Sequence, residues 1–376
     1  MLAVVAVGHG GQPFAAEQVP DRHPVDPKLL EEFFEAGVAG FQIRKSDHFV
    51  IAFDTPYAEL QPLIGRIEGT YRAILEFCKG ERLEAPRPAE RVRILFFDQF
   101  DDFSSAAASS GLTTDNIAGF YDPNRHVSVF CSVRANPWLA KINQRIAQTQ
   151  ERLQGLDAGA VPASASLRRE RDLRKALSDL RTRRDVLTEK FNRNVVQHEV
   201  AHQMFFTLGV HVQGAYNPLW LIEGLACVFE VPQPGAGGPR LRITHGRLGD
   251  LREAVGVPHH ARSVSDADYD AAVRAGSLIP LEELVSGDAG LVGPDADMRL
   301  GYAQAWGLVY YLHREYREAF GGYLQAVSRR QPGEPVGAAR ERREFEAAFG
   351  PLDGAFQRRW LNYMLKLRLD RHEAGL

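Results

Sequence analysis

The stretch from Phe191 to Leu208 constrains the fold most, because it contains no glycine or proline and has the composition of one helix. It includes the sequence His-Glu-Val-Ala-His at positions 198–202. Side chains four positions apart share one face of a helix, so His198 and His202 can reach the same ion. Two neutral imidazoles suit zinc and leave room for a third ligand and a water molecule. We therefore expect a metal site on this helix, with Glu199 placed to take a proton from that water.

A second apolar stretch, residues 217–226, offers the third ligand. Its sequence is Asn-Pro-Leu-Trp-Leu-Ile-Glu-Gly-Leu-Ala, which places Glu223 on a helix 21 residues beyond His202. Gly209 and Gly214 allow the chain to turn between the two helices. Pro218 suits the start of the second helix.

Small residues follow the third ligand directly. We expect Gly224 and Ala226 to let the two helices approach closely around the ion. The sequence therefore predicts His198, His202 and Glu223 as metal ligands on two neighbouring helices.

The combination H-E-x-x-H followed by W-x-x-E-G-x-A resembles the gluzincin metallopeptidases, and most closely the peptidase MA-like proteins. The resemblance covers roughly residues 40–135 and 191–320. It implies an α+β, zincin-like fold, with a mixed twisted sheet over an active-site helix and a mainly helical C-terminal lobe. It also implies Zn²⁺ as cofactor, Glu199 as general base and a peptide or protein as substrate.

The same resemblance implies further site residues. A strand that precedes the active helix would bind extended substrate by strand addition, which points to Gly119, Phe120 and Tyr121. Tyr302 would donate a hydrogen bond to the developing oxyanion. The G-x-M-E-N sequence of aminopeptidase-type members is absent, so an endopeptidase is favoured over an exopeptidase.

Four segments follow from the pattern along the chain. Residues 1–29 read as a tail, and residues 30–136 alternate strands and helices as a sheet-bearing lobe, with a hairpin at 38–53, a helix at 55–78 and a strand pair at 117–133. Residues 137–190 read as an inserted helical hairpin, rich in arginine and running directly into the helix that carries His198. Residues 191–376 hold the two ligand helices and a helical lobe, with its strongest helix at 302–320 and an aromatic one at 354–369.

Composition excludes some partners. Lys and Arg total 45 against 48 for Asp and Glu, so no overall basic field exists to attract nucleic acid. No apolar run is long enough for a membrane helix. The apolar start at Leu2 to Val7, followed by Phe14-Ala15-Ala16, resembles a signal peptide without its basic residues, which slightly favours an exported or periplasmic protein.

The remaining reactive residues carry weaker expectations. Cys78, Cys131 and Cys227 are predicted to be small buried residues, and Cys227 lies four positions after Glu223. His211 and His245 are alternative oxyanion donors, and His259-His260 reads as a surface pair.

Two other functions stay open at this point. One is a zinc hydrolase that acts on an ester or a non-peptide amide. The other is a non-catalytic zinc-containing binding protein, in which the hairpin and the helical lobe engage a partner, and a blocked cleft would favour it.

Overall fold

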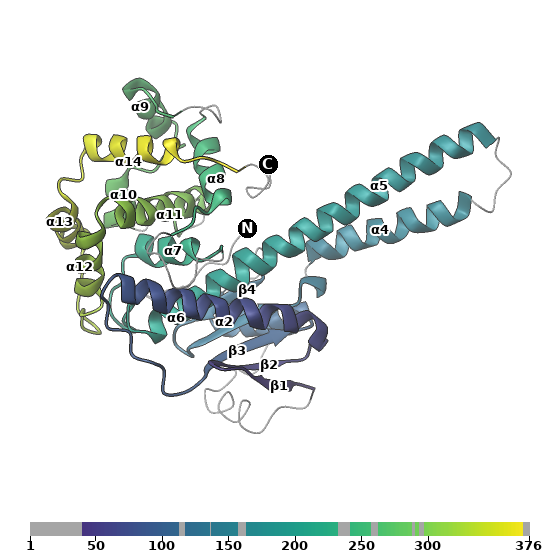
Figure 1. The fold of residues 1–376 in the computed structure, drawn as a ribbon, viewed down its shortest axis with the longest axis horizontal. Helices are drawn as coiled ribbons and strands as arrows, with labels where there is room; N and C mark the ends of the chain where they lie inside the picture. The colour runs from purple at the N-terminus through teal and green to yellow at the C-terminus, as the bar shows by residue number, and fades with distance from the viewer. Residues whose placement is uncertain are drawn as a thin grey trace.

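The computed structural model describes residues 40–112, 117–135, 137–156, 163–231, 241–256, 262–287, 290–292 and 297–370. The fold is α+β and mostly helical, with one mixed sheet of five strands and thirteen α-helices in this part of the chain (Figure 1). No helix among these residues is both long enough and apolar enough to cross a lipid bilayer. The tail at 1–29 and the pair His259-His260 lie outside the described residues.

The sheet has the strand order β1-β2-β3-β5-β4. Its central strands β2, β3 and β5 are parallel, and both edge strands run antiparallel to their neighbours. The bounds are β1 Gln42–Lys45, β2 Phe49–Phe53, β3 Val92–Phe97, β4 Gly119–Asp122 and β5 Val127–Cys131. The β1–β2 hairpin and the β4–β5 pair are the two strand pairs that the sequence predicted.

Alternation along the strands sends side chains to two separate layers. On β2, Phe49, Ile51 and Phe53 join the main core, whereas Val50 and Ala52 join a smaller cluster. The main core lies under helices α2 (Tyr57–Gly80) and α6 (Gln197–Thr207), and the smaller one under α3 (Phe100–Ser109). Both faces of the sheet are therefore covered, as buried parallel strands require.

The C-terminal part is helical and shares the main core with the sheet. Tyr316 separates α11 from α12, so the single helix expected at 302–320 is wrong. The bounds are α7 Leu219–Val228, α8 His245–Val255, α9 Asp266–Arg274, α10 Leu281–Ser286, α11 Met298–Glu315, α12 Arg317–Val327, α13 Ala338–Phe349 and α14 Gly354–Lys366.

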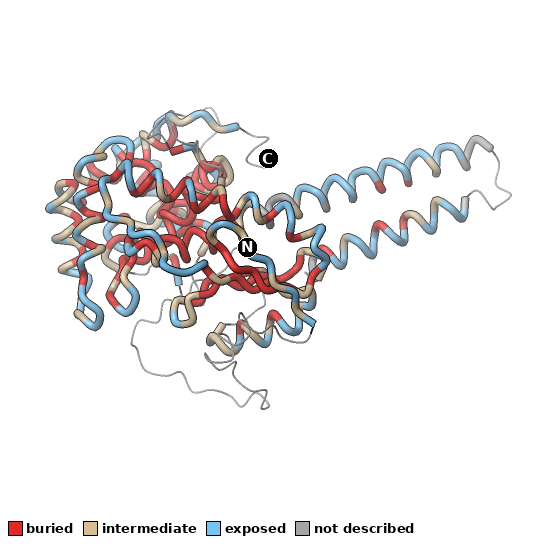
Figure 2. Tube along the Cα trace, turned by 60° about the horizontal axis from the view of Figure 1, so that its bottom comes forward, coloured by how far each residue is buried: buried red, intermediate tan, exposed pale blue. Residues whose placement is uncertain are grey.

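Helices α4 (Pro137–Leu156) and α5 (Ala163–Lys190) form a long hairpin that projects from the body (Figure 1). A short 3-10 turn, Val133–Ala135, leads into α4, and a π-helix, Phe191–Val196, joins α5 to α6. Figure 2 shows the hairpin largely exposed beside a buried body. The two helices pack on each other through residues such as Leu173 and Leu177, and their main contacts with the body lie at the base. The outer parts of α4 and α5 point away from α6 and α7 (Figure 1).

Candidate metal centre

Helix α6 holds the two histidines and is fixed beneath the sheet. The Gln203 amide donates to the backbone oxygens of Arg93 and His126, at 2.9 and 3.0 Å, and accepts a bond from Ser128. His198 and His202 then project from the same face, with their Nε2 atoms 3.0 Å apart. The helix therefore delivers both imidazoles to one point.

Helix α7 brings Glu223 to the same point. Its Oε2 lies 3.2 Å from Nε2 of His198 and 3.5 Å from Nε2 of His202. The turn between the helices has positive φ at Gly209 and Gly214, where glycine is unstrained. Asn217 closes the turn by accepting from the Val212 amide and donating to the oxygens of Val212 and Ala215.

The spacing of these three atoms fits a tetrahedral ion. Ligand atoms about 2.05 Å from a tetrahedral zinc lie about 3.3 Å from one another. The three observed separations, 3.0, 3.2 and 3.5 Å, bracket that value. All three side chains are fully or almost fully buried, and two ring nitrogens and a carboxylate oxygen form a donor set that suits zinc.

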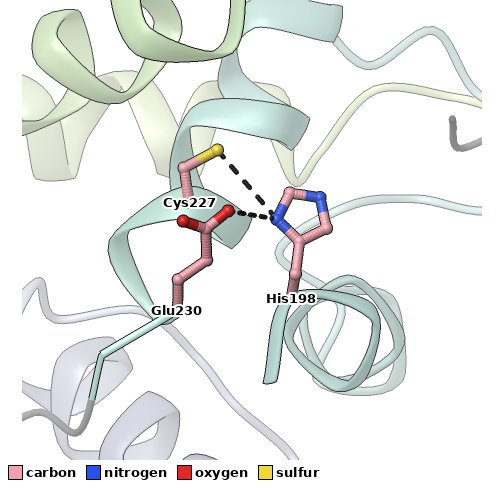
Figure 3. A group of neighbouring side chains, drawn as sticks. All are labelled: His198, Cys227 and Glu230. Carbon is pink, nitrogen blue, oxygen red and sulfur yellow. Dashed lines mark hydrogen bonds and ion pairs between the residues drawn. The ribbon is translucent and has the colours of Figure 1, made fainter. Parts of the chain in front are cut away.

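Glu230 fixes the proton on His198 (Figure 3). Its Oε1 lies 3.1 Å from Nδ1 of His198, and because a carboxylate only accepts, Nδ1 must carry the hydrogen. In the neutral ring, Nε2 then presents its lone pair toward His202 and Glu223. With the hydrogen of His202 on Nδ1, three acceptors would converge there, an arrangement that a cation would stabilise.

Arg247 on α8 holds Glu230 in turn. Its guanidinium donates to both carboxylate oxygens, at 2.5 and 3.1 Å, and both side chains are buried. The Cys227 thiol lies 4.0 Å from Nδ1 of His198 (Figure 3). His198, Cys227 and Glu230 could by geometry form a second metal site. The adjacent guanidinium disfavours a cation there, so we interpret the three as the support of His198.

The pKa values of the three candidate ligands differ in direction. Burial alone would lower the pKa of His198, but hydrogen bonds to Cys227, Glu223 and Glu230 raise it well above its usual value. Burial lowers the pKa of His202. Burial would raise the pKa of Glu223, yet the two histidines hold it at about 2. The cluster therefore favours one positive charge beside an ionised Glu223, and either a proton on His198 or a bound cation can supply it.

Glu199 lies beside the cluster, and neither carboxylate oxygen makes a hydrogen bond of good geometry with a described residue, although the nearby Tyr121 backbone opposes the rise of its pKa. It is fully buried, and this burial raises the pKa of Glu199 to about 8, against the opposing charge of His198. A buried carboxylate without a partner is unfavourable for folding. Such a group is typical of a catalytic site.

Tyr302 on α11 lies against the cluster. Its ring centroid is 5.8 Å from that of His198, and the Arg247 guanidinium carbon lies 5.3 Å from the centre of its ring. Burial, reinforced by the charges of Glu223, Cys227 and Glu199, raises the pKa of Tyr302 well above its usual value. The hydroxyl thus stays protonated and able to donate near neutral pH.

The candidate substrate strand is the edge strand β4. Phe120 and Tyr121 are each 1% exposed, and the Tyr121 hydroxyl bonds Nδ1 of His126 at 2.7 Å. A Cβ on Gly119 would lie 2.6 Å from Cδ1 of Phe130 and 2.8 Å from Cγ1 of Val195. Packing therefore explains this glycine, and the side chains of Phe120 and Tyr121 are not available to a substrate.

The other candidate residues lie in structural surroundings. His211 is buried, neither ring nitrogen has a hydrogen-bond partner within the described part of the chain, and burial lowers its pKa to about 3. Nδ1 of His245 accepts a bond from the Asp370 amide at 3.1 Å. Cys78, Cys131 and Cys227 are free and buried, as expected.

Sequence reasoning missed Glu230 and Arg247. Glu230 lies seven residues beyond Glu223, in the turn that follows the end of α7 at Val228, so helical spacing from Glu223 does not reach it. No spacing rule points to Arg247, which comes from a separate helix.

Gly224 was expected to allow close approach of α7 to the helix that carries the histidines, and its actual neighbour is a different helix. A Cβ there would lie 2.5 Å from the backbone oxygen of Ala305 and 2.6 Å from Val309, both on α11. Gly224 thus permits close contact of α7 with α11 and not with α6.

Comparison with known proteins adds one similarity. The model of a family described as a protein of unknown function, DUF1570, matches residues 192–334, a stretch that contains α6, α7 and Tyr302. No curated protein and no solved structure matches the chain significantly.

Proposed function

We propose that this chain is a zinc-dependent hydrolase, and specifically a peptidase that cleaves within peptide chains. The observation that carries the proposal is the convergence of Nε2 of His198, Nε2 of His202 and Oε2 of Glu223 beside a buried carboxylate without a partner. The gluzincin-like spacing of the two motifs supports the same interpretation.

His198, His202 and Glu223 would hold the ion, with Glu230 and Arg247 fixing the orientation of His198. A bound zinc ion would polarise the scissile carbonyl and lower the pKa of a water molecule. The charge of a bound ion would oppose the effect of burial and keep Glu199 ionised, so that this carboxylate takes the proton of that water and passes it to the leaving amine. Tyr302 donates its hydroxyl hydrogen to the oxygen that gains negative charge.

The substrate class rests on the resemblance and on β4. An edge strand offers backbone groups on its open side, which suits an extended peptide. The absence of the amino-terminus motif favours an internal peptide bond. A zinc hydrolase that acts on esters or non-peptide amides would use the same three metal ligands and the same general base, Glu199.

Burial of the cluster favours a second candidate, a zinc-containing binding protein without turnover. The exposed fractions of His198, Glu199, His202 and Glu223 are 0–1%, so these side chains have almost no access to solvent in this conformation. In that case the ion would stabilise the junction of α6 and α7 and leave Glu199 unused.

Metal analysis combined with digestion of a peptide library separates the two candidates. For the Glu199→Gln protein we expect zinc to be retained at wild-type stoichiometry and turnover to fall by about a thousandfold or more. His202→Ala should lose both zinc and turnover. Full activity of the Glu199→Gln protein would contradict the proposed role of Glu199 as general base. Zinc binding without hydrolysis in the wild type would favour the zinc-containing binding protein.

A further inference from the structure

The hairpin of α4 and α5 carries a net charge opposite to that of the rest of the chain. Residues 137–190 contain 12 Lys and Arg against 7 Asp and Glu, whereas the other residues contain 33 against 41. The near balance of the whole chain averages over these two regions and hides the basic one. Since the hairpin projects from the body (Figure 1), a polyanion can reach its basic residues without approaching the body closely.

The basic residues of α5 lie on three sides of the helix. Arg168, Arg171 and Lys175 are exposed and share one helical face. That face is opposite the inner face, where Leu173 and Leu177 are buried in the contact with α4. Each flank of the helix adds one more exposed cation, and these two are Arg181 and Arg183.

These five cations form no ion pair with another described residue, although two other arginines of α5 do pair with carboxylates. The contrast is with α13, another arginine-rich helix, where Arg340 and Arg342 each pair with two carboxylates. Pairing of this kind is usual where charges only stabilise and solvate a surface helix. The outer side of α5 instead presents unneutralised positive charge to solvent.

We propose that the outer side of α5 binds double-stranded DNA through its phosphates, without reading its sequence. A helix with its side chains is about 10–12 Å across, and the major groove is about 12 Å wide with phosphates along both edges. Cations on both flanks of α5 can therefore approach both edges while Arg168, Arg171 and Lys175 face the groove. Arginine suits this role because its guanidinium forms paired hydrogen bonds with phosphate oxygens.

Other polyanions fit this surface less well. Single-stranded nucleic acid is usually held by stacking on aromatic rings, and α5 contains no phenylalanine, tyrosine or tryptophan. A flat anionic membrane would meet the cations of one side only. Insertion into it would need a continuous apolar face, whereas the exposed large apolar residues of α5, Leu167 and Val186, lie near opposite ends of the helix.

The test is fluorescence anisotropy of a labelled DNA duplex of about 20 base pairs, titrated with the full-length protein. We expect a micromolar Kd at 50 mM salt and a loss of affinity of about a hundredfold at 200 mM, as for about four neutralised phosphates. The combined variant Arg168→Gln/Arg171→Gln/Lys175→Gln/Arg181→Gln should weaken binding at 50 mM about thirtyfold or more and reduce the salt dependence.

A matched control removes the same number of charges from the body. Arg72, Lys79, Arg274 and Arg329 are also exposed and form no ion pair with a described residue. Their combined replacement by glutamine should leave the affinity within about threefold of wild type. Replacing Arg168, Arg171 and Arg181 by lysine keeps the charge, so binding should stay within about fivefold.

The proposal is independent of metal binding and of hydrolysis. Absence of salt-dependent binding, or an equal loss in the hairpin and body variants, would overturn it. Binding of the single strand, of poly-glutamate or of phosphatidylglycerol vesicles at least as tightly as the duplex at 50 mM salt would overturn the assignment of DNA as the partner. Loss of binding in the lysine variant equal to that in the glutamine variant would contradict its electrostatic basis.

Discussion

The hairpin and the junction of α6, α7 and α8 use the same residue types in opposite surroundings. On the hairpin, Arg174 and Glu170 are paired at 2.7 Å, with side chains 67% and 30% exposed. At the junction, Arg247 and Glu230 are paired at 2.5 Å, with side chains 4% and 1% exposed. The distances are similar, so any difference in how much the two ion pairs contribute to stability comes from their burial.

That difference has a simple electrostatic origin. Water screens the exposed pair and also solvates each partner when the pair separates, so the pair adds little stability. At the junction neither partner has access to water, and the loss of one would leave the other charged and buried. Four predictions test this contrast.

The largest effect on stability is expected from Arg247→Met, which leaves Glu230 buried without its cation. We expect a loss of about 3–5 kcal/mol in the free energy of unfolding, measured by urea denaturation. At the proposed metal site, zinc affinity should fall by about 10–100-fold, because Glu230 would no longer hold His198 in place. A loss below about 1 kcal/mol would contradict the importance given to this buried pair.

Gly224→Ala tests the packing of the junction without changing a charge. The added methyl would lie 2.5 Å from the Ala305 oxygen, so α7 and α11 must separate. We expect destabilisation by about 1–3 kcal/mol in thermal or urea unfolding. Gly322→Ala, where the space is open, should instead stabilise by up to about 1 kcal/mol.

Glu68 provides an intermediate case that depends on pH. It accepts bonds from Ser46 and from the His48 backbone and ring, and these bonds lower its pKa although burial opposes them. A lowered carboxyl pKa stabilises the fold above the unfolded pKa of about 4.3, and this stability is lost as pH falls through the lower, folded value.

Glu68→Gln should therefore lower the unfolding free energy by about 1–2 kcal/mol at pH 7. The gap to wild type should narrow as pH falls below about 4. Urea titrations at pH 7 and pH 3.5 measure both quantities. A gap that is constant with pH would show that the ionised form of Glu68 is not the one that stabilises the fold.

The smallest effect is expected on the hairpin. Arg174→Met removes an exposed partner of Glu170 and should change the unfolding free energy by no more than about 0.5 kcal/mol. Urea denaturation of Arg174→Met and Arg247→Met side by side compares the losses in unfolding free energy of the two variants directly. A comparable loss in both variants would remove the contrast between the two regions.

Local pattern was enough for much of the fold. Alternation predicted the β1–β2 hairpin and the β4–β5 pair, and helical spacing predicted α2 and the hairpin helices, because these patterns arise within short segments. The division of 302–320 at Tyr316 was not predictable in this way, since the apolar pattern continues across the break.

In the candidate site too, local sequence patterns predicted some of the contacts and not others. His198 and His202 share a helix and Glu223 follows a short turn, so spacing alone suggested that they converge. Arg247 reaches Glu230 only through the packing of α8, and the neighbour of Gly224 is on α11, about eighty residues later in the chain. Such contacts depend on tertiary packing, which single-sequence patterns do not encode.

The length of the hairpin sets how far its tip lies from the body of the protein. Since α4 and α5 pack mainly on each other, removing the same number of residues from both leaves their two ends at the base in place. Each residue of a helix contributes about 1.5 Å, so seven fewer residues per helix would retract the tip by about 10 Å. The reach of this arm is thus adjustable by length alone, independently of the chemistry at its base.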